Sequence, residues 1–297
     1  MTNDKSRPVS AQSSTPDPQP TAFAWQPLTP RGVAAFATAS MGRLGLVQLI
    51  VALLAATTMV WFLYSAWFPT VQEAIHQLPA RGDIHGGRLD WGGDTPRLLA
   101  EGLFVSFLVD LNQEGQAGRV AHVQVELRKA DFRICSLPGC FTFRYPQGWI
   151  VALNRTELEP WWGAWRPAIM AGVFVVTLVA LLVAWWLMAT LYCVPTWIIA
   201  LYADRDLELQ EGWKLAAAAL LPGALVLIAA IFLYGLNLID PVRLGICAAL
   251  HFVVGWLYLF LSPLSRPRRF AGPAAWRNPF SRTNAEPGST AKSDTDR

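Results

Sequence analysis

Charged residues are scarce in this chain of 297 residues: 15% are Asp, Glu, Lys or Arg, and 53% are hydrophobic. Soluble globular domains usually carry about 25% charged residues, so the composition favours a membrane protein. The chain also lacks any Lys/Arg cluster interleaved with aromatic residues, which excludes a nucleic-acid surface. The shortage is concentrated, because no Asp, Glu, Lys or Arg lies inside any of four long apolar runs.

These four runs predict a bundle of four transmembrane helices, since about twenty apolar residues cross a bilayer as a helix. We expect the spans over residues 44–68, 167–203, 215–236 and 243–262. The second run is too long for one straight span and contains Pro195, which predicts a kink or break there. Residues 196–203 would then run along or below the interface. Two full spans in this run are the alternative, but the second would be short.

The distribution of basic residues predicts the orientation. Tails 1–43 and 263–297 are expected to be disordered, and they carry four and seven Lys/Arg residues respectively. Lys/Arg excess marks the cytoplasmic side, so both tails and the 204–214 loop are expected inside. The first run exceeds the ~7–15 apolar residues of a cleaved signal peptide, so we expect it to be a permanent anchor.

Residues 69–166 contain alternating apolar and polar positions, which predicts a small β-rich domain outside the membrane, inserted between spans 1 and 2. The turn-forming segment Asn112–Gly118 separates alternating stretches at 103–111 and 119–127. This arrangement predicts a β-hairpin. His122 falls on the polar face of the second stretch, and we expect it to be exposed to solvent.

Two cysteines flank the turn Leu137-Pro138-Gly139. If Cys135 pairs with Cys140 across a hairpin, Ile134 opposes Phe141 and Phe132 opposes Phe143, and the apolar side chains share one face. Cysteines directly opposite in a hairpin are within disulfide reach, so we predict a Cys135–Cys140 disulfide on the oxidising side of the membrane. Free thiols or a metal-binding pair are the alternatives, and the second half of a zinc site is missing.

A cluster of ionisable residues in the outer domain is the candidate site. Asp83, His85 and Asp90, followed by Asp94, lie in a glycine-rich segment. His and carboxylate groups together bind metals or move protons, whereas a solvated turn is the plain structural interpretation. Within the spans only His251 is ionisable. Ion-coupled carriers need such groups inside the membrane, so that class is not expected.

Several short motifs resemble the Yip-related family of bacterial membrane proteins of unknown function, some members of which are named maltodextrin-utilisation proteins. They are Gly86-Gly87-Arg88-Leu89, Leu108-Val109-Asp110, Tyr202-Ala203, Leu207, Gly212-Trp213-Lys214-Leu215-Ala216 and Pro222. The resemblance implies a multi-pass protein of the bacterial inner membrane. It implies no activity and no catalytic residues.

The hypothesis that these observations favour is a non-enzymatic accessory, scaffold or sensor protein without a cofactor. Its outer domain would contact a protein partner or a second copy of itself. One alternative is a membrane-anchored enzyme or metal-binding protein that uses residues 83–94. Another alternative is a passive channel or small-solute carrier.

Overall fold

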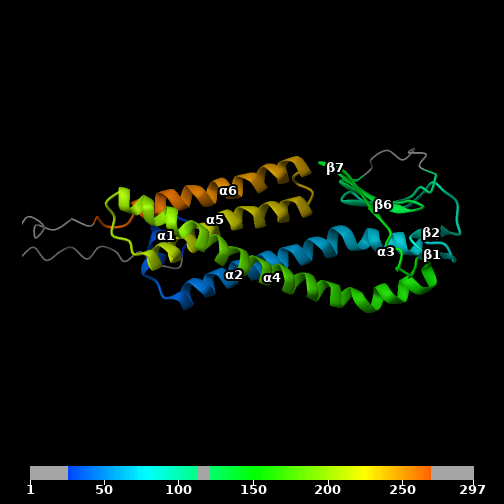
Figure 1. Cartoon of the computed structure of the whole chain (residues 1–297), viewed down its shortest axis with the longest axis horizontal. Helices are drawn as coiled ribbons and strands as arrows, with labels where there is room; N and C mark the ends of the chain where they lie inside the picture. The colour runs from blue at the N-terminus through cyan, green and yellow to red at the C-terminus, as the bar shows by residue number, and fades with distance from the viewer. Residues whose placement is uncertain (1–25, 113–120, 269–297) are drawn as a thin grey trace, which may run out of the picture.

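The computed structural model describes residues 26–112 and 121–268. In this part of the chain, four helices are long and apolar enough to cross a membrane, and a region of β-sheet lies between the first and the second (Figure 1). Both ends of the described chain lie at the end of the bundle opposite to the sheets. The predicted number of long apolar helices and the place of the β-rich insertion are therefore confirmed.

The first long helix extends far beyond the predicted span. Its continuous helical stretch covers Met41–His76, and its parts are α2 (Met41–Phe62), the π-helical η2 (Leu63–Trp67) and α3 (Phe68–His76). Ser40 caps its start, because the hydroxyl oxygen accepts from the backbone N–H of Arg43 at 3.3 Å. Within α3, Ala74 and Ile75 are buried. These contacts keep the chain helical after it leaves the predicted membrane.

The prediction of disorder over 1–43 is wrong for its last part, and residues 1–25 lie outside the described chain. Helix α1 (Pro30–Ala35) and the 3₁₀ turn η1 (Phe36–Thr38) precede α2. Val33, Phe36 and Ala37 are fully buried in the core of the bundle. Burial of these apolar residues offsets the entropy of ordering the segment.

The other three long helices are α4 (Arg155–Tyr202), α5 (Leu209–Gly235) and α6 (Pro241–Leu264). Helix α4 continues through Pro195, so a break there is excluded, and residues 196–202 form its last turns. Cys193, Thr196 and Ala200 remain buried around the proline, so packing holds this segment helical. The connection to α5 is shorter than the predicted 204–214 loop, because a capping box between Glu208 and Glu211 starts α5 early.

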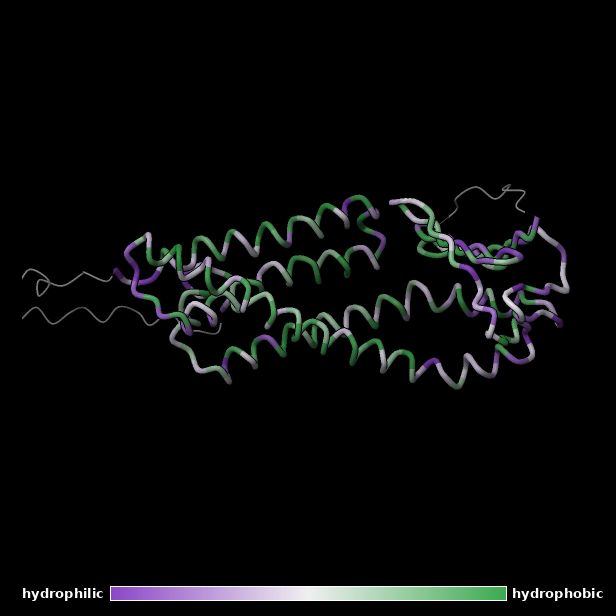
Figure 2. Tube along the Cα trace, viewed as in Figure 1, coloured by the Kyte–Doolittle hydropathy of each residue, from purple (hydrophilic) through white to green (hydrophobic). Residues whose placement is uncertain are grey.

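Helix α5 is the centre of the bundle. In the most apolar stretch of 18 residues of α5, 56% of the residues are buried, against 6% in the same stretch of α4 and 11% in that of α6. A run of small residues from Ala216 to Ala219 is fully buried, and small residues let membrane helices approach closely. The apolar colouring of all four helices in Figure 2 gives way to polar residues at the bundle ends and in the outer domain.

The outer domain contains two sheets. The smaller has the order β2-β1-β8 and the larger the order β3-β4-β5-β6-β7. The strands are β1 (Gly82–His85), β2 (Arg88–Trp91), β3 (Arg97–Glu101), β4 (Val105–Val109), β5 (Val123–Leu127), β6 (Asp131–Ser136), β7 (Gly139–Arg144) and β8 (Val151–Ala152). Their shared core includes Leu89, Leu99 and Val109, and Ala74 of α3 joins it.

The predicted hairpin of residues 103–111 and 119–127 is wrong, because β4 and β5 pair in parallel, with Val105 opposite Val123. Residues 113–120 lie outside the described chain. A parallel pair needs a crossover connection of about a dozen residues, and positions 110–122 supply one. Alternating side chains are compatible with either direction of pairing, so the pattern alone did not distinguish them.

The second hairpin has the predicted register, with Ile134 opposite Phe141 and Phe132 opposite Phe143. Cys135 and Cys140 are also directly opposite and form a disulfide with an S–S distance of 2.02 Å. Since β4 and β5 run in parallel and β6 runs against them, the disulfide lies at the same end of the sheet as Val105 and Val123.

Candidate functional site

The predicted cluster lies on the polar face of the β1–β2 hairpin. Asp83 is directly opposite Asp90, and strand alternation puts His85 on the same face, while Ile84 and Leu89 are buried behind them. The Nδ1 of His85 donates to Asp83 Oδ2 at 2.6 Å. The His85 side chain is 61% exposed, so this pair is open to solvent.

The same hairpin offers no complete metal site. In residues 26–112 and 121–268, no group of three or more His, Cys, Asp or Glu side chains is placed to hold a metal ion. Asp94, the last member of the predicted cluster, accepts a hydrogen bond from the Trp91 indole through its backbone oxygen at 3.4 Å. The arrangement of Asp83 and His85 is a solvated hydrogen bond on the exposed face of β1.

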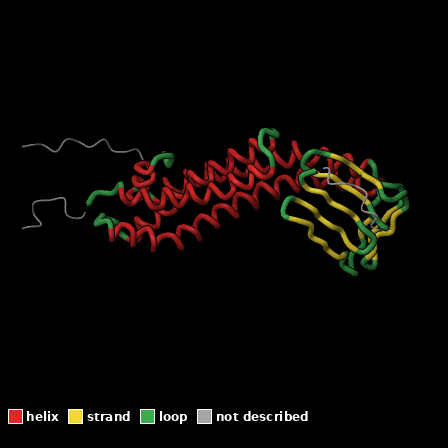
Figure 3. Tube along the Cα trace, turned by 90° about the horizontal axis from the view of Figure 1, so that it is seen from above, coloured by secondary structure: helices red, strands yellow, loops and turns green. Residues whose placement is uncertain are grey.

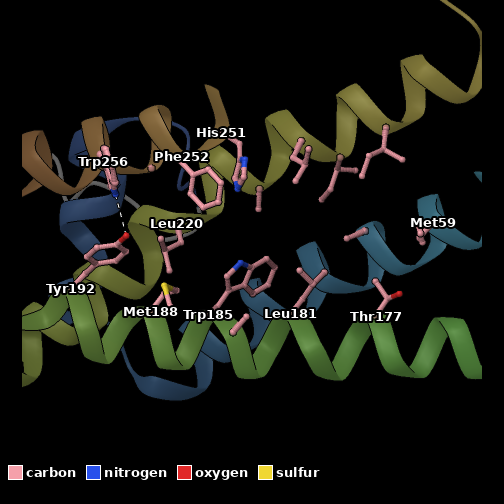
Figure 4. Close-up of a pocket in the computed structure, with 17 residues that line it drawn as sticks. Met59, Thr177, Leu181, Trp185, Met188, Tyr192, Leu220, His251, Phe252 and Trp256 are labelled. Carbon is pink, nitrogen blue, oxygen red and sulfur yellow. Dashed lines mark hydrogen bonds between the residues drawn. The ribbon is translucent and has the colours of Figure 1, made fainter. Parts of the chain in front are cut away.

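A second candidate is a cavity of about 350 Å³ inside the bundle, between α2, α4, α5 and α6. Its walls are mostly apolar, and Trp256 of α6 donates to the Tyr192 hydroxyl of α4 at 3.1 Å across it (Figure 4). His251 is the one histidine in its lining, and its Nδ1 donates to the carbonyl oxygen of Ala248. The lining of this cavity contains no Asp, Glu, Lys or Arg.

The outer domain rests on the bundle through an aromatic junction formed by Phe62, Phe104, His122 and Tyr234. The ring centroids of Phe62 and Phe104 are 5.4 Å apart, and those of Phe104 and Tyr234 are 5.0 Å apart. A hydrogen bond of 2.8 Å joins His122 Nδ1 to the Tyr234 hydroxyl. Phe62, Phe104 and Tyr234 are all buried, so the junction fixes the sheet against the ends of α2 and α5.

His122 was expected on an exposed polar face, and that expectation is wrong. Desolvation by burial lowers the pKa of His122 below its ordinary value of 6.5, and the nearby Asp240 carboxylate opposes this shift. The neutral imidazole is therefore the form that the junction favours. No local pattern could reveal this role, because Tyr234 lies 112 positions away in the chain.

Acid is expected to loosen the junction. Because its pKa is lowered when docked, His122 binds protons more readily when undocked, so docking is fully stable above about pH 6.5 and weakens as the pH falls below it. Hydrogen exchange of the backbone amides of residues 103–106 and 122–124 should therefore be faster at pH 5.5 than at pH 7.5, after correction for the intrinsic rate. His122→Asn should abolish this pH dependence. The same acid response in that variant would exclude His122 as its source.

The third candidate is a partly exposed apolar surface on β6 and β7, here called the β6–β7 face: the half-buried Phe132 and Ile134 and the exposed Phe141 and Phe143. The two β7 residues are 57% and 48% exposed. β7 is an edge strand of the larger sheet within the described chain. Unpaired backbone groups along such an edge accept a further strand. This face therefore combines apolar side chains with free hydrogen-bonding groups.

Comparison of the chain with protein-family models, with curated proteins and with solved structures found no match. The resemblance to the Yip-related family stays a prediction. The functional argument therefore depends on the geometry of the sites themselves.

Proposed function

We propose that this protein is a non-enzymatic multi-pass membrane component, an accessory, scaffold or sensor subunit, whose outer domain binds a second protein through the β6–β7 face. The observation that carries the proposal is the pair Phe141 and Phe143, exposed on an unpaired edge strand. Exposed aromatic residues of this kind are frequent binding hot spots. An extended segment of the partner would add a strand beside β7.

Strand addition at β7 favours a different protein over a second copy. The strands of the larger sheet lie side by side in Figure 3 and overlap in Figure 1, so the long axis of the helices runs roughly in the plane of the sheet. Antiparallel pairing of two β7 strands needs a two-fold axis perpendicular to that plane. Rotation about this axis would reverse the direction of the second helix bundle. Two copies inserted in one membrane with the same orientation cannot be related in this way.

The proposed location is the bacterial inner membrane, with both termini in the cytoplasm. Arg266 and Arg268 follow α6 at the end of the bundle away from the sheets, which fits the cytoplasmic excess of basic residues. The Cys135–Cys140 disulfide lies in the outer domain, which fits an oxidising compartment. Both observations support the same orientation.

Photo-crosslinking in native membranes tests the binding face. Benzoyl-phenylalanine in place of Phe141 or Phe143 should give an adduct with one partner protein. In place of Thr142, whose side chain points to the opposite face by strand alternation, the yield of the adduct should be lower. Phe143→Ser should weaken partner binding roughly tenfold or more. The matched control is Ile150→Ser, since Ile150 is 86% exposed but lies outside the sheet.

Two results would contradict the proposal. Adducts of equal yield from positions 141 and 142 would show that contact is not specific to one face. An adduct with the mass of two copies of this chain would show self-association in place of a different partner.

A further inference from the structure

A polar cavity of about 270 Å³ lies between α3 and α4, near the predicted outer boundary of the membrane. Its polar walls are Gln72, His76, Glu159, Trp162 and Arg166. Arg166 is the last charged residue before the uncharged run of span 2, and Trp161 and Trp165 beside it are half exposed. Tryptophan is enriched at the headgroup layer, so this α3–α4 cavity lies at headgroup depth.

The end of the cavity nearest the membrane presents hydrogen-bond donors without acceptors. The guanidinium carbon of Arg166 lies 4.9 Å from the ring centroid of Tyr64 and 5.6 Å from that of Phe68. These contacts position the cation, yet within the described chain it has no ion-pair partner. The Nε1 of Trp162 is buried and also lacks an acceptor among the described residues. Both groups suit a phosphate oxygen.

The end farther from the membrane presents a carboxylate. Glu159 precedes Arg166 by seven residues, which corresponds to roughly 10 Å along the helix axis. Its Oε2 accepts from Arg155 Nε at 3.1 Å, and its Oε1 lies 3.5 Å from His76 Nδ1. The Glu159 side chain is 45% exposed. Exposed ion pairs of this kind are weak, so the carboxylate remains able to accept another cation.

We propose that the α3–α4 cavity binds the headgroup of an ethanolamine phospholipid from the outer leaflet, with its phosphate at Arg166 and its ammonium at Glu159. A lipid held by its acyl chains presents the phosphate nearest the membrane and the ammonium two carbon atoms farther out. The order of the two charges in the cavity matches this order. A glycerol headgroup lacks the cation, and a choline headgroup lacks N–H donors, so neither satisfies both ends. The assignment to the outer leaflet rests on the proposed orientation, whereas the binding of the headgroup does not depend on the proposed partner.

Native mass spectrometry of the full-length protein in detergent tests the site with three dioleoyl lipids, carrying ethanolamine, glycerol or choline headgroups. The ethanolamine lipid should bind at least several-fold more tightly than the other two. Arg166→Gln should weaken its binding roughly tenfold, the usual effect of losing a charge-assisted hydrogen bond. Glu159→Gln should remove the preference for ethanolamine. Arg243→Gln is the matched control, because Arg243 is 67% exposed at the outer end of α6.

Equal binding of the three lipids would overturn the proposal, and so would equal affinity in the Arg166→Gln and Arg243→Gln variants. Displacement of the lipid by an equal concentration of soluble glycerophosphoethanolamine would assign the site to a free headgroup instead of a membrane lipid. If Arg166→Gln does not fold, Arg166→Lys decides the question. It keeps the cation but loses the planar fork, and wild-type affinity in that variant would exclude a bidentate contact between the Arg166 guanidinium and the phosphate.

Discussion

Replacing Gly223 with leucine is expected to destabilise the bundle by about 3 kcal/mol. Gly223 lies in α5 where this helix crosses α6, and a Cβ atom there would overlap the carbonyl oxygen of His251 and lie 3.4 Å from the backbone nitrogen of Gly255. Both obstacles are backbone atoms of a packed helix, so they cannot move aside as a side chain could. Leucine would therefore push α6 away from the central helix.

The matched control is Gly172→Leu in α4, because a Cβ at Gly172 meets nothing within 4 Å. Both changes replace glycine with leucine inside a helix and gain the same helix propensity. The difference between their free energies of unfolding therefore reports the contact between α5 and α6. The measurement is reversible unfolding of the full-length protein in mixed micelles, followed by tryptophan fluorescence. If the two variants were equally stable, the close approach of α5 and α6 at Gly223 would be wrong.

The four membrane helices could be predicted because charge depletion is a property of the linear sequence. Their ends could not, since the ends depend on what packs beside them. Helix α3 continues to His76 because Ala74 packs in the core of the outer domain, and α1 forms because Val33 and Phe36 pack in the bundle core. In both places, packing against another part of the fold keeps the chain helical where the sequence predicted the end of a span or a disordered tail.

The two hairpin predictions show the same division between local and distant information. The turn at Pro138 and Gly139 and the flanking cysteines specify the β6–β7 register within a few residues, and that register is the observed one. The pairing of β4 with β5 is decided by a crossover connection and the rest of the sheet. Alternation reports which residues are buried, not the direction in which two strands run.

The candidate sites divide in a similar way. Asp83 and His85 could be recognised in the sequence because they are close in the chain, and the structure leaves them on the solvent-facing side of β1. The contact of His122 with Tyr234 joins distant elements, as does the α3–α4 cavity. Such sites need the arrangement of helices in space, and no spacing of residue types along the chain indicates them.

The largest electrostatic effect is expected at Glu126, on the polar face of the larger sheet. Its side chain is 3% exposed, and its Oε2 accepts from Arg133 at 2.9 Å (Nε) and 2.5 Å (Nη2). The Nε of Arg128 lies 3.1 Å from its Oε1. Glu126→Ala would leave two guanidinium groups without this carboxylate in a largely dry environment, and removing one partner of a buried pair typically costs about 3–5 kcal/mol.

Because Arg133 is 33% exposed, water compensates part of the loss, and we expect about 3 kcal/mol in the free energy of opening the outer domain. Hydrogen exchange of the β5 and β6 amides in the full-length protein measures that free energy. Glu101→Ala is the control, since Glu101 is an exposed carboxylate in the same sheet. In the double variant Glu126→Leu with Arg133→Leu, the cost should fall below that of Glu126→Ala, because fewer charges are left unpaired. A double variant as unstable as the sum of its two single changes would show that Glu126 and Arg133 do not stabilise each other.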